Sequence, residues 1–376
     1  MRASTFLQEV RKIGIDTAAG VPDSTLKQFC DALWLDGGAV FRHYVTANEG
    51  AAVGLAAGAY LATKRPCLVY LQNSGLGNII NPLASIANDE VYGIPMLFVV
   101  GWRGEPGTQD EPQHIYQGKV TCELLEVMGV PFSVIDADTT AVQLKEILAK
   151  AGAQFAENRQ YAVVVRRGAF AKEQEFLWEN GCDLLREQAL KVILEKVYQQ
   201  AFIVSTTGKI SRELYEQSDA LYGAHDRLFL TVGGMGHASM IAYGMAQADP
   251  GKRIVCVDGD GAVMMHMGAL GFLAKQAPKN MVHIVINNAA HESVGAVPTG
   301  CSGQSYAQIA RECGYENVYL VRTVPELETA LSEVLRCWAL SMIEVMVSLD
   351  ARADLGRPRE SAMENKIRFM EAYRGR

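Results

Sequence analysis

The stretch VCVDGDGAVMM, residues 255–265, runs from apolar residues into Asp-Gly-Asp-Gly (258–261) and back into apolar residues. The apolar run is typical of a buried strand, and glycines on either side of an acid predict a tight turn where that strand ends. A second polar turn, Asn-Asn (287–288), follows after 25 residues, which is room for one helix and one strand. Both turns are therefore expected at the ends of adjacent strands of one sheet.

The rest of the chain repeats this alternation of short apolar runs and longer helical stretches. Runs that are apolar on both faces are typical of a parallel sheet covered by helices on both sides. The sequence therefore predicts an α/β protein with two doubly wound parallel-sheet domains, at residues 1–178 and 179–376, of about six strands each. The expected strands lie within residues 17–21, 40–47, 66–72, 95–102, 131–136 and 161–168, and within residues 201–208, 228–234, 253–261, 281–288, 317–323 and 342–348.

Composition narrows the class of protein. The formal net charge is −7, whereas binding to the nucleic-acid backbone requires a basic face. The eight cysteines are scattered without a CxxC pair, which predicts reduced thiols rather than a zinc site or a disulfide framework. The N-terminal segment lacks the apolar core of a signal peptide, and no apolar run reaches the ~18 residues of a membrane span. We therefore expect a cytoplasmic protein that binds neither nucleic acid nor membranes.

Three common ligand-binding motifs with glycine-rich turns do not match this sequence. An EF-hand needs further oxygen ligands after Asp260, but residues 262–269 (AVMMHMGA) supply none. The segment TTGKIS (206–211) ends like a P-loop but lacks the first glycine, and Ile210 stands where a Ser or Thr is needed. The G-x-G-x-x-G fingerprint of a nicotinamide-binding site is absent from the sequence.

The pairing of the two polar turns points instead to a metal and a diphosphate. The Asp260 carboxylate, an Asn288 amide oxygen and a nearby backbone carbonyl are hard oxygen ligands, which suit Mg²⁺ shared with a phosphate group. Glycines beside them would let the backbone approach a diphosphate closely. By spacing alone, ordinary strand-to-helix connections are the alternative interpretation of the two turns.

The sequence Gly-Asp-Gly, followed after 25 residues by Asn-Asn, resembles the magnesium- and diphosphate-binding motif of thiamine-diphosphate enzymes. Segments over nearly the whole chain resemble one branch of that family, the phosphonopyruvate decarboxylases. These segments are GVPDSTLKQFCDAL (20–33), NEGAAVGLAAGAYLAT (48–63), YLQNSGLGNIINPLASIAN (70–88), GWRGEPGTQDEPQHIYQGKVT (101–121), STTGKISREL (205–214), GGMGHASMIAYGMA (233–246) and ADLGRPRESAMENKIRFM (353–370). The resemblance implies the thiamine-diphosphate-binding fold, with a pyrimidine-binding domain followed by a diphosphate-binding domain. The chain is too short for the central third domain of larger relatives.

The resemblance implies thiamine diphosphate and Mg²⁺ as cofactors. Asp260 and Asn288 match the side-chain ligands of the metal, and Ala290 would add its backbone oxygen. Glu49 matches the glutamate that protonates the aminopyrimidine ring; considered alone, it would be explained as a helix-initial acid. The other implied cofactor-binding residues are Gly208, Gly233, Met235, Gly259, Gly261, Ala262 and His291. Glu292 stands where the resemblance implies an aspartate.

The implied reaction is decarboxylation of 3-phosphonopyruvate, a 2-keto acid bearing a phosphonate, to phosphonoacetaldehyde and CO2. Sulfopyruvate decarboxylase, or a related 2-keto acid decarboxylase or carboligase, is the alternative, because a sulfonate needs similar donors. His114 is a catalytic candidate that could move protons. Candidate substrate-binding residues on strand-end loops are Ser24, Asn73, Ser74, Asn78, Arg103 and Lys209. Each could also be an ordinary loop residue, although Arg103 and Lys209 suit a phosphonate by charge.

The resemblance also implies a homodimer or a higher homo-oligomer. In this superfamily the cofactor lies between the pyrimidine domain of one subunit and the diphosphate domain of another. Gly- and Ala-rich segments at residues 50–62 and 236–246 suit close helix packing at such an interface, or equally within a domain. Phosphonate biosynthesis is the implied setting.

Overall fold

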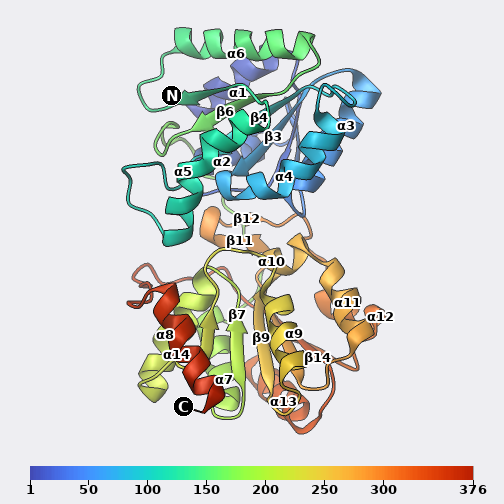
Figure 1. The fold of residues 1–376 in the computed structure, drawn as a ribbon, viewed down its shortest axis with the longest axis vertical. Coiled ribbons are helices and arrows are strands. Elements are labelled where there is room, and N and C mark those ends of the chain that lie inside the picture. The colour runs from blue at the N-terminus through green and yellow to red at the C-terminus, as the bar shows by residue number, and fades with distance from the viewer. Residues whose placement is uncertain (376) are drawn as a thin grey trace. The chain divides into compact units, whose positions relative to one another are not determined.

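A computed structural model of the chain describes residues 1–375, which form two compact units, each built on its own six-stranded sheet (Figure 1). The first unit contains Met1–Trp178 and Val294–Gly300, and the second contains Glu179–Ser293 and Cys301–Arg376. The short segment Val294–Gly300, which the sequence placed with the second domain, thus packs with the first unit. The predicted α/β class is confirmed, and every expected strand range contains a strand of one of the two sheets.

The sheet of the first unit has the strand order β2-β1-β3-β4-β6-β5, with every neighbouring pair parallel. Its strands are β1 (Thr17–Gly20), β2 (Arg42–Val45), β3 (Cys67–Gln72), β4 (Met96–Gly101), β5 (Phe132–Ile135) and β6 (Tyr161–Val165). Its helices are α1 (Ala3–Lys12), α2 (Lys27–Asp36), α3 (Glu49–Thr63), α4 (Leu76–Pro82), α5 (Pro112–Val127) and α6 (Ala141–Ala156). Short helical turns η1 (Asn73–Gly75) and η2 (Leu83–Ala87) flank α4.

Side chains of this sheet alternate between two separate hydrophobic cores. On β4, Leu97 and Val99 belong to the core that also contains buried residues of α1, α2 and α6. Their neighbours Phe98 and Val100 belong to the core that contains buried residues of α3, α4 and α5. Because both faces of the strand are covered, it is apolar at every position rather than at every second one.

The sheet of the second unit has the strand order β13-β14-β10-β9-β7-β8 and is also parallel. Its strands are β7 (Phe202–Ser205), β8 (Leu228–Leu230), β9 (Ile254–Gly259), β10 (Met281–Asn287), β13 (Asn317–Val321) and β14 (Ser341–Met346). The second unit also contains the two-residue strand β11 (Ala290–His291), whereas β12 (Val297–Pro298) lies in the segment Val294–Gly300 of the first unit. Its helices are α7 (Arg186–Val197), α8 (Lys209–Tyr222), α9 (Ala238–Ala248), α10 (Asp260–Met265), α11 (Gly268–Gln276), α12 (Tyr306–Cys313), α13 (Val324–Arg336) and α14 (Ala362–Arg374); η3 (Glu292–Val294) is a short turn.

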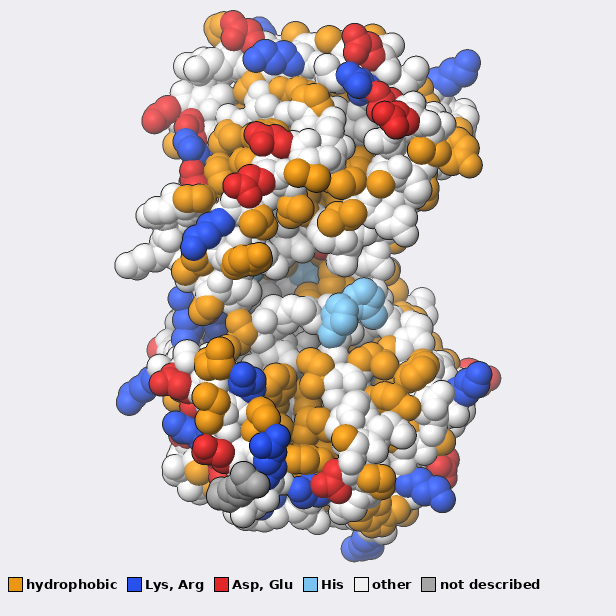
Figure 2. All heavy atoms as spheres, viewed as in Figure 1, with side chains coloured by type: hydrophobic (Ala, Val, Ile, Leu, Met, Phe, Trp, Pro, Cys, Tyr) orange, Lys and Arg blue, Asp and Glu red, His pale blue; other side chains and the backbone are white. Residues whose placement is uncertain are grey.

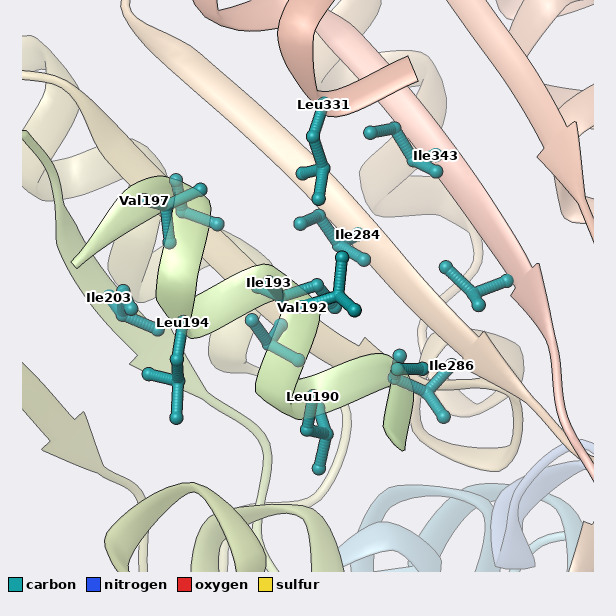
Figure 3. Packing of buried hydrophobic residues seen from close by; sticks show 14 of the residues in the cluster. Leu190, Val192, Ile193, Leu194, Val197, Ile203, Ile284, Ile286, Leu331 and Ile343 are labelled. Carbon is teal, nitrogen blue, oxygen red and sulfur yellow. The ribbon is translucent and has the colours of Figure 1, made fainter. Parts of the chain in front are cut away.

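Helices α7 and α13 close one face of this second sheet. Ile193 and Leu194 of α7 and Leu331 of α13 lie in one core with the strand residues Ile284 and Ile343 (Figure 3). The core is made almost entirely of branched aliphatic side chains, which pack densely and keep the strand ends in fixed positions. A rigid sheet edge is what a site built from strand-end loops requires.

Strands β9 and β10 are neighbours, and Ile286 pairs with Gly259 at their carboxyl ends. The two polar turns of the sequence therefore follow adjacent strands, as the spacing predicted. On the face shown in Figure 2, Lys and Arg side chains are interspersed with Asp and Glu and form no continuous basic band. Among the helices of residues 1–375, none is both long and apolar enough to cross a membrane.

Candidate active site

Asp260 is a buried acid at the first position of α10, directly after β9, and only 5% of it is exposed. Its Oδ2 atom is buried without a hydrogen-bond partner among the described residues. Burial raises the pKa of Asp260 to about 7, although backbone N–H groups of Gly261 and Ala289 act in the opposite direction. A buried carboxylate with an unsatisfied oxygen is costly, and a divalent cation would remove that cost.

Asn288 follows β10, and its side chain is buried with a fixed orientation. Its Nδ2 donates to Glu292 Oε2 at 3.0 Å, and its Oδ1 accepts from the Ala290 amide at 3.1 Å. Between them Ala289 adopts φ +57°, a left-handed conformation that is uncommon for a non-glycine residue. This turn brings Asn288 and the Ala290 backbone to the same side of the sheet edge as Asp260, because all three line one cavity.

The cavity joins most of the residues that the sequence assigned to the cofactor and the metal. About 90 Å³ of it is accessible to water-sized groups. Its lining includes Gly208, Lys209, Met235, Gly259, Asp260, Gly261, Ala262, Asn288, Ala290, His291 and Glu292, together with Arg186, Thr206 and Thr207. Gly233 is not part of the lining; its amide donates to the hydroxyl of Thr207 at 3.2 Å.

Two glycines of the cavity are required by geometry. Gly208 has φ +100°, a conformation that residues with a side chain rarely adopt. A Cβ on Gly261 would lie 3.2 Å from both the Met235 methyl carbon and His291 Cε1, tighter than ordinary packing. The backbone at these positions therefore stays bare, as needed where it approaches a bound phosphate group.

A buried ion cluster, which the sequence pattern did not predict, borders the cavity. Arg186, of which 3% is exposed, donates two hydrogen bonds to Glu213 and one to Glu292. Glu292 Oε1 also accepts from Lys209 Nζ at 3.2 Å. Arg186 is the first residue of α7. Lys209, expected among the substrate donors, lines the same cavity as Asp260 and Asn288.

Asp260, Asn288 and Ala290 fit a diphosphate group with a bound Mg²⁺. The donor set consists of a carboxylate, an amide oxygen and a backbone carbonyl, which are the ligands Mg²⁺ prefers when phosphate oxygens complete its shell. The unsatisfied Oδ2 of Asp260 and the bare backbone of the glycines are the observations that support the fit.

In the first unit, Glu49 is the first residue of α3, and only 4% of it is exposed. Its Oε2 accepts from Asn78 Nδ2 at 2.7 Å, and burial raises its pKa above the ordinary value. Gly75 packs against the carboxyl group so closely that a Cβ there would overlap with it. Asn78, expected to bind substrate, thus holds Glu49, and a carboxyl group with a raised pKa suits proton exchange near neutral pH.

Arg103 lies in the loop after β4, and the carboxylate of Asp110 holds its side chain. Its Nε and Nη2 both donate to the Asp110 carboxylate, and its Nη1 donates to Ser24 Oγ at 3.0 Å. Burial alone would raise the pKa of Asp110, but the hydrogen bonds from Arg103 hold it well below its usual range. Asn73 fixes the backbone of Arg103, since its Nδ2 donates to the Arg103 carbonyl and its Oδ1 accepts from the Arg103 amide.

A separate chain of hydrogen bonds connects neighbouring strand ends of the first sheet. Ser74 donates to Gln72 at 2.7 Å, and Gln72 donates to the fully buried Asp23, which also accepts from the amides of Thr25 and Leu26. Neither Asp23 nor Gln72 was singled out from the sequence, although they adjoin the candidate substrate-binding residues Ser24 and Asn73. The chain orders the polar edge of the first sheet.

His114 lies on α5, and its Nδ1 is buried without a hydrogen-bond partner among the described residues. Burial, followed by the positive charge of Arg103, lowers the pKa of His114. The imidazole is therefore neutral at pH 7, with one ring nitrogen able to accept a proton.

Two family models match the chain. The model described as "Thiamine pyrophosphate enzyme, N-terminal TPP binding domain" matches residues 2–123, and "Thiamine pyrophosphate enzyme, C-terminal TPP binding domain" matches residues 220–345. Together with the two parallel-sheet units and the cavity at the GDG turn, these matches define a thiamine pyrophosphate enzyme.

Curated relatives define the branch. The chain is 33% identical to a phosphonopyruvate decarboxylase of Streptomyces viridochromogenes over 98% of its own length and 94% of the relative. It is also 33% identical to a phosphonopyruvate decarboxylase of Streptomyces hygroscopicus, over 98% and 93% of the two chains. A sulfopyruvate decarboxylase of Methanosarcina acetivorans is 26% identical over 91% and 90%. The chain belongs to the phosphonopyruvate decarboxylase family of thiamine pyrophosphate enzymes and is a carboxy-lyase.

Proposed function

We propose that this enzyme decarboxylates 3-phosphonopyruvate to phosphonoacetaldehyde and CO2, with thiamine diphosphate and Mg²⁺. Higher identity to the two phosphonopyruvate decarboxylases than to the sulfopyruvate decarboxylase supports this substrate. The structural observation that carries it is Arg103, a partly buried arginine with both backbone and side chain fixed at the sheet edge of the first unit.

In the second unit, Asp260, Asn288 and the Ala290 carbonyl would hold Mg²⁺, and the backbone of Gly259, Gly261 and Ala262 would contact the diphosphate. Lys209 in the same cavity suits the diphosphate rather than the substrate. Bound thiamine diphosphate supplies the electron sink that lets a 2-keto acid lose CO2. The chain contributes orientation and charge balance around it.

In the first unit, Glu49 would exchange a proton with the ring nitrogen of the aminopyrimidine. Asn78 and Gly75 keep its carboxyl group in one position, and burial raises its pKa above the ordinary value, which favours the protonated form. His114 would accept or return a proton on the substrate, because its imidazole is neutral and has a nitrogen without a protein partner among the described residues.

Arg103 would bind the phosphonate of the substrate. Its hydrogen bonds to Asp110 and Ser24 use three of its five N–H groups, which leaves two to donate to an oxyanion. Because the guanidinium is already held in place, it loses little conformational entropy when it binds an anion. Its fixed orientation favours a tetrahedral anionic head group. Sulfopyruvate presents similar oxygens and is the competing substrate.

The test is CO2 release from phosphonopyruvate, sulfopyruvate and pyruvate, each with thiamine diphosphate and Mg²⁺. We expect the highest kcat/KM with phosphonopyruvate and a much lower value with pyruvate, which has a carboxylate but lacks the second anionic group that would bind Arg103. A clear preference for sulfopyruvate would overturn the substrate assignment. A carbon–carbon bonded product formed with an added aldehyde would instead identify a carboligase.

A further inference from the structure

Glu292 is the residue at which three donors around the cavity meet. Its carboxylate accepts from Arg186 Nη1, from Lys209 Nζ at 3.2 Å and from Asn288 Nδ2 at 3.0 Å. Its side chain is almost fully buried, with 8% exposed. Such a carboxylate is in place either to neutralise a buried charge or to orient a neighbouring group.

Neutralisation of Arg186 does not explain Glu292. Glu213, which is fully buried, already accepts hydrogen bonds from both Nε and Nη2 of Arg186, the two-point geometry that best satisfies a guanidinium. One carboxylate is enough for one buried arginine. The second, Glu292, therefore has a different primary task.

The geometry of Asn288 indicates that task. An ionised carboxylate can only accept hydrogen bonds, and a backbone amide can only donate one. With Glu292 on one side and the Ala290 amide on the other, only one orientation of the Asn288 side chain satisfies both neighbours. That orientation directs Nδ2 to Glu292 and leaves the second lone pair of Oδ1 available for a cation.

We propose that Glu292 is a positioning residue for the metal site: it fixes the Asn288 amide with its oxygen toward Mg²⁺ and keeps Lys209 at the cavity wall. The inference rests on the proposed function, since it takes Asn288 as a metal ligand. The hydrogen bond from Asn288 Nδ2 to a carboxylate also increases the negative charge on Oδ1 and strengthens it as a ligand. Glu292 itself does not touch the cation.

The experiment compares Glu292→Gln with the wild type in binding of Mn²⁺, a spectroscopically visible substitute for Mg²⁺, at saturating thiamine diphosphate. Free Mn²⁺ is measured by electron paramagnetic resonance, so no turnover is needed. Glutamine offers the Asn288 amide either an oxygen or an NH2 group, so only the Ala290 amide would still favour one orientation of the Asn288 side chain. We expect Mn²⁺ affinity to fall about 10- to 100-fold, the usual effect of losing a partner of a metal ligand.

Glu213→Gln is the matched control, because it removes a carboxylate from the same arginine without touching Asn288. We expect a lower thermal midpoint and nearly unchanged Mn²⁺ affinity. Glu292→Asp keeps the negative charge and is expected to recover most of the affinity, which also serves if Glu292→Gln folds poorly. Equal Mn²⁺ affinity in the wild type and Glu292→Gln would overturn this inference alone. No metal-dependent binding of thiamine diphosphate to the wild type would overturn the proposed function and this inference with it.

Discussion

Neighbouring residues hold individual side chains of the candidate site in one position, and Glu49 is the clearest case. Its carboxyl group lies between the Asn78 amide and the Cα of Gly75, in surroundings that raise its pKa. Burial of an ionisable carboxyl group lowers stability, so a group kept in that state is a candidate for catalysis.

Glu49→Gln is expected to reduce turnover about 10²- to 10⁴-fold, the range for loss of an acid–base group. The folded protein holds the Glu49 proton to a higher pH than the unfolded chain, so the unfolded chain ionises first as pH rises. The free energy of unfolding therefore decreases as pH rises from about 4.5 through the folded pKa of Glu49. Without cofactor, Glu49→Gln should be more stable than the wild type at pH 7 and similar at pH 4.

Urea unfolding at these two pH values measures the difference in stability, and CO2 release measures turnover. Wild-type turnover in Glu49→Gln would contradict the assigned role. Equal stability of the two proteins at pH 7 would show that burial of this carboxyl group has no cost.

Gly75→Ala tests the position of the same carboxyl group. Gly75 has φ −77°, so alanine is allowed by the backbone, and the effect must come from overlap of its Cβ with Glu49. A displaced reactive group is expected to lower kcat about 10- to 100-fold. Gly77→Ala is the control: it lies in the adjoining helix α4, where a Cβ would meet no atom within 4 Å. Similar losses in both variants would indicate a general effect on α4 instead.

At the scale of elements, the strands and the adjacency of the two polar turns at the candidate site could be predicted, but the internal bonding of the loops could not. Strands such as β4 and β6 are apolar throughout because both sides are covered, and this pattern is visible in the sequence. Asn73 and Asn78 were expected to bind substrate, whereas their amides bond to Arg103 and Glu49. Whether a side-chain donor already bonds to another residue of the protein depends on contacts between distant segments. No local sequence pattern predicts such contacts.

The loop between β4 and α5 is organised by Asp110, which no sequence pattern singled out. Its carboxylate accepts from the Arg103 side chain and from the amides of Gly104 and Glu111. One residue thus sets both the path of the loop and the direction of the guanidinium. Its flanking residues in the sequence, Gln109 and Glu111, give no sign of this.

Asp110→Asn is expected to release Arg103 and to lower kcat/KM for phosphonopyruvate about 10- to 100-fold, mainly through KM. Pyruvate, which lacks the phosphonate, serves as the control substrate and should be much less affected. Steady-state kinetics with both substrates in the wild type and the variant gives the comparison. An equal loss with both substrates would mean that Asp110 supports the loop in general and not the binding of the anionic group.

For the whole molecule, the two units carry different parts of the proposed chemistry. Glu49, Arg103 and His114 belong to the first unit, whereas Asp260 and Asn288 belong to the second. The division into two parallel-sheet units could be anticipated from the two series of apolar runs. The placement of Val294–Gly300 with the first unit could not, because it depends on packing rather than on a strand or helix pattern.

If active sites form between subunits of a homodimer, as proposed from the family resemblance, two inactive variants should complement each other. Glu49→Gln damages the first unit and Asp260→Asn the second. A mixed dimer would then contain one site with both substitutions and one intact site. Because one of its two sites is intact, we expect the purified mixed dimer to show about half of wild-type turnover.

Co-expression with two affinity tags yields the mixed dimer, and CO2 release from the doubly purified sample is compared with each variant alone. The intact site explains recovery only if residues of both chains contribute to it. In a chain that completes its own site, every site of the mixed dimer would carry one damaging substitution. Turnover no higher than that of the separate variants would therefore contradict a site shared between subunits, even if gel filtration showed a dimer.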